Sequence, residues 1–150
     1  MGKRKKVYDE VFRRAESRVE SQGGEGLQSP DSRLQTPRGD GVILDATFVT
    51  QSLRRRAAEI AAKHHRTFVI MQTTCPQEVS IARILRRTKE DYESNALTEQ
   101  AYFNNKARFE AVDLDDFKQL YPNLSIIHFT VDTQYDPPED WYIIGVRKMP

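Results

Sequence analysis

Residues 68–79 read FVIMQTTCPQEV, and a change from strand to helix falls inside this stretch. The first seven residues are a continuous apolar and β-favouring run, which is typical of a buried strand. Thr74, Pro76 and Gln77 then have the spacing of a helix start, with a capping hydroxyl and a proline in the first turn. The stretch therefore predicts a strand that runs directly into a helix.

The same alternation extends in both directions along the chain. Further strands are predicted at residues 42–48 (VILDATF), at 124–131 (LSIIHFTV) and from residue 141 onward (WYIIGVRK). Further helices are predicted from the capping Thr50 through His64, from Thr98 to about 109, and from Asp113 to before Pro122. Strands that alternate with helices of this length predict an α/β fold, with a mainly parallel sheet and helices on both faces.

The chain divides by composition into three parts. Residues 1–20 carry apolar side chains at every fourth position, which predicts an amphipathic helix. Residues 21–41 are rich in Gly, Ser, Pro and charge, and are expected to be a loop or a disordered insert. Residues 42–150 hold the alternating pattern and are expected to form the α/β core.

Composition excludes several classes of protein. With 38% apolar and 30% charged residues, the chain is neither wholly disordered nor a membrane protein. The balance of 23 Lys and Arg against 22 Asp and Glu lacks the basic excess of a surface devoted to nucleic acid. The single cysteine, Cys75, and a start without an apolar signal core predict a cytoplasmic protein with no membrane contact.

Chemistry is expected at the carboxyl ends of the predicted strands, where ligands bind in parallel sheets. Asp45 and Thr47 follow one such strand, and a carboxylate there can hold Mg²⁺ through water or accept a proton from a hydroxyl. The alternative is that either side chain hydrogen-bonds the backbone of the next turn. Asp132 and Thr133 end the last clear strand and could border a base or ribose.

Three arginines on one helix form the second candidate group. Arg83, Arg86 and Arg87 have i, i+3 and i+4 spacing, which places them on one helical face. Guanidinium groups match phosphate oxygens, so a polyanion such as a triphosphate would relieve their mutual repulsion. The alternative is a solvated face balanced by nearby carboxylates. Val79, Ala82 and Leu85 are expected to face the protein interior from the same helix.

These motifs, in this order, resemble the later part of small P-loop kinases of the polynucleotide-kinase-like group, often described as AAA-type ATP-binding proteins. The resemblance rests on VILDATF, FVIMQTTCPQEV and the ARILRR segment before a lid-like helical stretch at about 83–110. It implies ATP and Mg²⁺ as cofactors and transfer of the γ-phosphate to a hydroxyl. Asp45 would then act near Mg²⁺, the three arginines would close over the phosphates, and Asp132 and Thr133 would lie near the adenine.

The family's phosphate loop is the main departure from this resemblance. No GxxxxGK[ST] pattern occurs in the 150 residues, and the strand, loop and helix that should precede Lys3 are expected to be missing. Activity of the chain alone is therefore expected to be impaired or lost, unless another polypeptide or a second copy completes it. The alternatives are a non-catalytic interaction module, or a nucleic-acid-binding remnant that uses Arg54, Arg55, Arg56 and the basic start.

Overall fold

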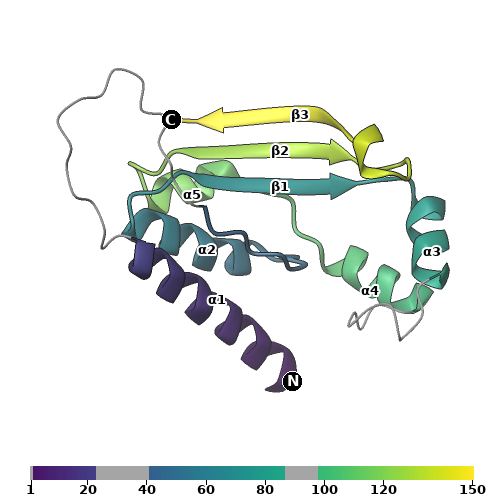
Figure 1. The fold of residues 1–150 in the computed structure, drawn as a ribbon, viewed down its shortest axis with the longest axis horizontal. Coiled ribbons are helices and arrows are strands. Elements are labelled where there is room, and N and C mark those ends of the chain that lie inside the picture. The colour runs from purple at the N-terminus through teal and green to yellow at the C-terminus, as the bar shows by residue number, and fades with distance from the viewer. Residues whose placement is uncertain (1, 23–40, 87–97) are drawn as a thin grey trace. The chain divides into compact units, whose positions relative to one another are not determined.

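The computed structural model describes residues 2–22, 41–86 and 98–150 (Figure 1). Contacts divide the chain into two compact units, residues 1–47 and 48–150. The first unit contains α1 (Gly2–Gln22), which confirms the helix predicted near the start of the chain. Apart from Ser21, Gln22 and Gly41, the predicted insert lies outside the described residues. Although α1 has 21 residues, no described helix is both long and apolar enough to cross a membrane.

The prediction of a strand at residues 42–48 is wrong. This segment has no regular secondary structure, and Ile43 within it is 90% exposed. The apolar run predicted burial, but a strand also needs a neighbour to accept and donate its backbone hydrogen bonds. None of the described strands pairs with residues 42–48. Pairing with a distant partner cannot be deduced from the run itself, and this explains the failed prediction.

The second unit alternates helices and strands as the sequence predicts. Its elements are α2 (Gln51–Lys63), β1 (Phe68–Thr74), α3 (Gln77–Arg86), α4 (Glu99–Arg108), α5 (Leu114–Leu120), β2 (Ile126–Asp132), the short 3-10 helix η1 (Pro138–Asp140) and β3 (Tyr142–Met149). The starts predicted for three helices are confirmed, and Thr50, Thr98 and Asp113 each accept a backbone N–H with their side chains.

The three strands form one sheet in the order β1-β2-β3. β1 and β2 run parallel, and β3 returns antiparallel to β2 with an irregularity after Thr130 (Figure 1). This sheet and its helices confirm the α/β class and are consistent with a P-loop NTPase-like fold. The strand predicted from residue 141 is also confirmed, and its position is at the edge, next to β2.

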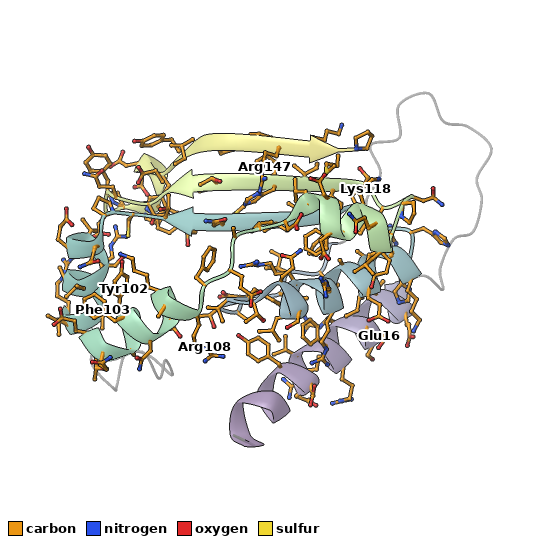
Figure 2. All side chains as sticks on the ribbon, turned by 180° about the vertical axis from the view of Figure 1, so that it is seen from behind. Glu16, Tyr102, Phe103, Arg108, Lys118 and Arg147 are labelled. Atoms are coloured by element: carbon orange, nitrogen blue, oxygen red, sulfur yellow. The ribbon has the colours of Figure 1, made fainter. Side chains whose placement is uncertain are left out.

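One face of this sheet packs against α2 and α5. Figure 2 looks onto that face, with α5, marked by Lys118, in front of the strands. The core joins helical and strand residues, namely Ala58, Val112, Leu114, Phe117, Leu124 and Ile126, with Phe68, Ile70 and Met149 packed against it. Within residues 48–86 and 98–150, no helix covers the opposite face. The sequence predicts helices on both faces of the sheet, whereas this part of the chain has a helical layer on one face only.

Arg54, which the nucleic-acid-binding alternative needs at the surface, lies in the interior. The residue is 3% exposed, and its guanidinium donates to the carbonyl oxygens of Val49, Glu110 and Ala111. It also lies over the ring of Phe109, 5.0 Å from the ring centroid. Burial lowers the pKa of Arg54, which nevertheless stays charged because its hydrogens meet oxygen acceptors. Arg54 thus fixes the segment between α4 and α5 to α2.

Candidate functional site

The candidate site lies where β1 and β2 end side by side. Their parallel register pairs Thr74 with Asp132 at the carboxyl ends. Thr133, which is 6% exposed, joins the two strand ends, because its N–H and its hydroxyl both donate to the carbonyl oxygen of Thr74, at 2.9 and 3.1 Å. The hydroxyl proton of this predicted nucleotide-binding residue is therefore used within the protein.

Asp132 also has partners within the protein. Its carboxylate accepts the N–H of Gln134 at 2.8 Å, two residues further along the chain, and the hydroxyl of Tyr142 at 3.4 Å. The negative charge of Asp132 raises the pKa of the Tyr142 phenol. Asp132 therefore shapes the turn that leaves β2, and its side chain links β2 to β3.

Arg83 anchors the loop that follows this turn. Its Nη2 donates to the carbonyl oxygens of Gln134 and Tyr135, at 3.2 and 3.1 Å, and to the carboxylate of Asp136 at 2.5 Å. The side chain is 19% exposed, and its Nε is buried with no hydrogen-bond partner among the described residues. Arg83 therefore binds the loop with one end of its guanidinium and leaves a second donor unsatisfied.

Arg86 reaches the same carboxylate from the solvent side. Its Nη2 lies 3.5 Å from the second carboxylate oxygen of Asp136, and its side chain is 67% exposed. The two arginines thus converge on one anionic group, as their i, i+3 spacing predicts. An exposed pair at this distance is weak, and an incoming anion with several oxygens can compete with Asp136 for Arg86.

The inward face of α3 differs from the predicted one. Ile84 is buried, whereas Leu85 is 65% exposed and Ala82 is also exposed. Arg83 can take an inward position because three oxygen acceptors satisfy its charge. The predicted arginine group therefore divides into a largely buried Arg83 and an exposed Arg86. Arg87 lies outside the described residues.

Asp136 is the site residue that the sequence analysis missed. In the sequence, Asp136 stands before Pro137 and Pro138, and such a pattern is typical of an interruption between two strands. A carboxylate in the loop after one parallel strand can pair with arginines on the helix that follows the adjacent strand, and this combination is a usable sequence signal. To use this signal, one must know that β1 and β2 are adjacent in the sheet, and neither segment reveals this alone.

Asp45 and Thr47 belong to the first unit. The side chain of Asp45 is exposed, and the Thr47 hydroxyl lies 3.0 Å from the phenolic oxygen of Tyr8 on α1. Thr47 therefore has a hydrogen-bond partner within its own unit. Because α3 and the 133–136 loop belong to the second unit, the predicted common pocket for Asp45 and the arginines stays a prediction.

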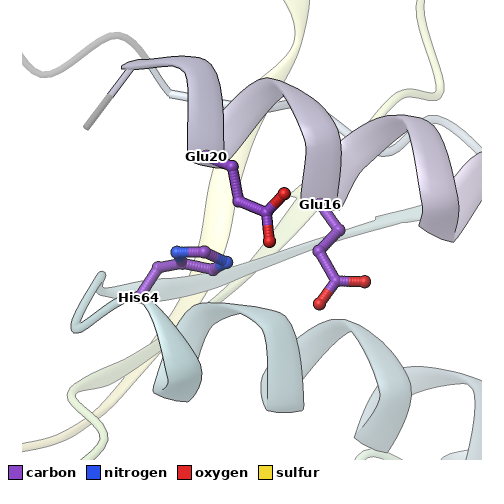
Figure 3. Close-up of side chains that lie close together, drawn as sticks. All are labelled: Glu16, Glu20 and His64. Atoms are coloured by element: carbon purple, nitrogen blue, oxygen red, sulfur yellow. The ribbon is translucent and has the colours of Figure 1, made fainter. Parts of the chain in front are cut away.

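Two further carboxylates share one side of α1. Figure 3 shows Glu16 and Glu20, which are four residues apart and therefore one helical turn apart. His64, drawn in the same figure, belongs to the second unit and is not grouped with them. Carboxylates at this spacing are common on solvated helices, and no metal site is assigned to the pair.

Comparison with known proteins gives one match. A family model described as an AAA domain matches residues 28–112. The match begins before α2 and ends between α4 and α5, so it includes α3 with Arg83 and Arg86. No curated protein and no solved structure matches the chain.

Proposed function

We propose, because this chain belongs to the AAA domain family, that it is a kinase-like domain that binds Mg-ATP. The site is the end of the sheet where Arg83 and Arg86 converge on Asp136. That convergence is the observation on which the proposal rests, because it collects two cations at the edge where parallel sheets bind ligands. In the bound state, phosphate oxygens replace the carboxylate at Arg86.

The two arginines have different roles in this proposal. Arg86 contacts phosphate directly, since its guanidinium is exposed and its contact with Asp136 is long. Arg83 is a positioning residue, because its bonds to Gln134 and Tyr135 hold the loop in place. Arg87 is proposed as a third phosphate contact, and Asp132 and Thr133 as the polar border beside the base.

Asp45 is proposed to act near Mg²⁺ in the same reaction, and Thr47 is proposed to contact phosphate. Carboxylate oxygens are suitable ligands for Mg²⁺, which usually keeps several of its waters, and the exposed Asp45 carboxylate can accept hydrogen bonds from such waters. When bound, Mg²⁺ supplies positive charge that neutralises phosphate oxygens. The transfer proposed is that of the γ-phosphate to a hydroxyl acceptor.

The transfer rate of these 150 residues is proposed to be low. The sequence has no GxxxxGK[ST] loop, which in P-loop enzymes supplies a row of backbone N–H donors and a lysine to the phosphates. Loss of a single preorganised donor typically costs about 2.7–4 kcal/mol of transition-state stabilisation, or 10²–10³ in rate. Binding of Mg-ATP, rather than turnover, is therefore the property that tests the proposal.

The test is calorimetric titration of the purified chain with Mg-ATP. Arg86→Ala should raise the dissociation constant about 5- to 10-fold, because it removes a charge-assisted bond to phosphate. Asp136→Asn should have the opposite effect and lower the constant about 2- to 5-fold. The amide keeps an oxygen acceptor for Arg83 but removes the charge that competes with phosphate for Arg86.

Two variants serve as matched controls. Arg66→Ala removes the same charge from an exposed residue just before the amino end of β1, and Asp140→Asn removes a carboxylate four residues from Asp136. Both should leave the dissociation constant within about twofold of the wild-type value. Absence of binding at millimolar Mg-ATP would overturn the proposal. So would equal effects of Asp136→Asn and Asp140→Asn, because general charge and not the paired site would then be responsible.

Two arginines in the basic segment of α2 weaken the nucleic-acid-binding alternative. Arg54 is buried among carbonyl oxygens, and Arg55 forms an ion pair with Asp116. These two cations are therefore engaged within the protein. Strong, salt-dependent retention on single-stranded DNA or RNA, in the absence of ATP binding, would favour that alternative over the kinase-like proposal.

A further inference from the structure

The face of the sheet opposite α2 and α5 is apolar and exposed. The strand register aligns its side chains in rows, Val69 with Ile127 and Lys148, and Met71 with Phe129 and Val146. A third row follows at the carboxyl ends of β1 and β2, where Thr73 and Ile143 flank Val131, which is only 8% exposed, and Ile144 is the extra residue on β3. In Figure 1 no helix lies in front of these strands. We call these residues the open face.

The open face is large for a surface that stays in water. Five of its apolar residues are between 49% and 68% exposed, namely Val69, Met71, Ile143, Ile144 and Val146. At roughly 100 Å² for a half-exposed aliphatic side chain, these five offer about 500 Å². The largest apolar patch of a typical monomer is roughly 300–600 Å², and patches at the upper end commonly mark interaction sites.

Exposed charges of opposite sign flank the open face, apart from Arg83 and Arg86, which pair with Asp136. Lys148 ends the first row, at the amino ends of β1 and β2. Beyond the carboxyl ends lies the β2–β3 connection, where η1 carries the exposed carboxylates Glu139 and Asp140. A surface with a cation at one end and carboxylates at the other is complementary to a copy of itself turned end for end.

We propose that the open face is a dimer interface, on which a second copy of this chain packs sheet against sheet. A two-fold axis perpendicular to the strands would set the two apolar faces together and place each Lys148 near Glu139 and Asp140 of the other copy. Two contributions of about 500 Å² reach the ~1,000 Å² that a specific interface needs. The inference does not depend on nucleotide binding, because none of the open-face residues belongs to the proposed ATP site.

The test measures molar mass by light scattering during gel filtration, over a dilution series of the full chain. The wild type should have twice the 17.4 kDa mass of one chain and dissociate on dilution. Met71→Lys and Val146→Lys should each yield monomers, because they place an unpaired charge in the middle row of the interface. The matched control is Leu120→Lys on α5, at a residue that is 49% exposed outside the open face, and it should stay dimeric.

Charge reversal tests the orientation of the two copies. Lys148→Glu should weaken the dimer at least several-fold, and adding Glu139→Lys and Asp140→Lys to it should restore association. Far-ultraviolet circular dichroism verifies that each variant is folded. A wild-type chain that is monomeric at every concentration would overturn the proposal. That result is expected if another polypeptide covers the open face. Dimers that survive both Met71→Lys and Val146→Lys, or that are lost equally in Leu120→Lys, would overturn it as well.

Discussion

Neighbouring arginines on α2 differ sharply in their surroundings. Arg54 is 3% exposed and donates to three carbonyl oxygens, whereas the side chain of Arg55 is 48% exposed and pairs with Asp116. The segment RRR at 54–56 gives no local sign of this difference. A buried arginine is stable here because the chain just before α2 and the segment between α4 and α5 turn carbonyl groups toward it.

The first prediction compares these two arginines. Arg54→Ala should lower the free energy of unfolding by about 3 kcal/mol or more, since it leaves a cavity and several buried carbonyl groups without donors. Arg55→Ala should lower it by less than about 1 kcal/mol, the range measured for exposed ion pairs. Urea unfolding followed by circular dichroism gives both values. Similar losses in the two variants would contradict the role assigned to Arg54.

At the scale of elements, the success of sequence analysis depended on how local each signal is. The starts of α2, α4 and α5 were predicted at Thr50, Thr98 and Asp113, and each of these side chains bonds within the first turn of its own helix. The strand at 42–48 failed because a strand needs a distant partner. For the site, the spacing of Arg83 and Arg86 was sufficient to predict that they share a helical face. Their common partner Asp136 required the order of the strands.

A polar row crosses the covered face of the sheet and makes its stability depend on pH. His128 on β2 is 5% exposed, and its Nε2 donates to the side-chain oxygen of Gln72 on β1 at 3.2 Å. Its Nδ1 accepts from Arg147 on β3 at 2.8 Å. This arrangement requires the neutral imidazole, because a proton on Nδ1 would face the guanidinium. Burial, together with the charge of Arg147, lowers the pKa of His128 in the folded protein.

The second prediction follows from the direction of this shift. Below the ordinary histidine pKa of about 6.5, the unfolded chain binds a proton at His128 that the folded protein excludes. The contribution of His128 to the free energy of unfolding is therefore fully present above that pH and declines as the pH falls below it. His128→Gln keeps hydrogen-bonding atoms but cannot titrate, so the urea midpoint of the variant should decline less between pH 7 and 5. Parallel declines in wild type and variant would show that His128 is not responsible.

At the scale of the whole molecule, the buried cluster around Phe117 lies within the second unit, although Phe12 and Ala15 on α1 of the first unit are buried as well. All six residues of the buried cluster, from Ala58 on α2 to Ile126 on β2, fall within residues 48–150. The same range contains the open face and the arginine pair. The first unit contributes Asp45 and Thr47 to the proposed chemistry. Folding and dimer formation should therefore depend on the second unit alone.

The third prediction tests this division by truncation. A fragment of residues 48–150 should keep a cooperative urea transition, because it retains the cluster and the partners of Arg54. A fragment of residues 68–150 should lack such a transition. It loses α2, and with it both Ala58 and the guanidinium that binds residues 109–111. A typical domain has a total stability of only about 5–15 kcal/mol, so such losses are expected to unfold it. An unfolded 48–150 fragment would mean that the first unit is needed for the core. A cooperative 68–150 fragment would mean that α2 is not.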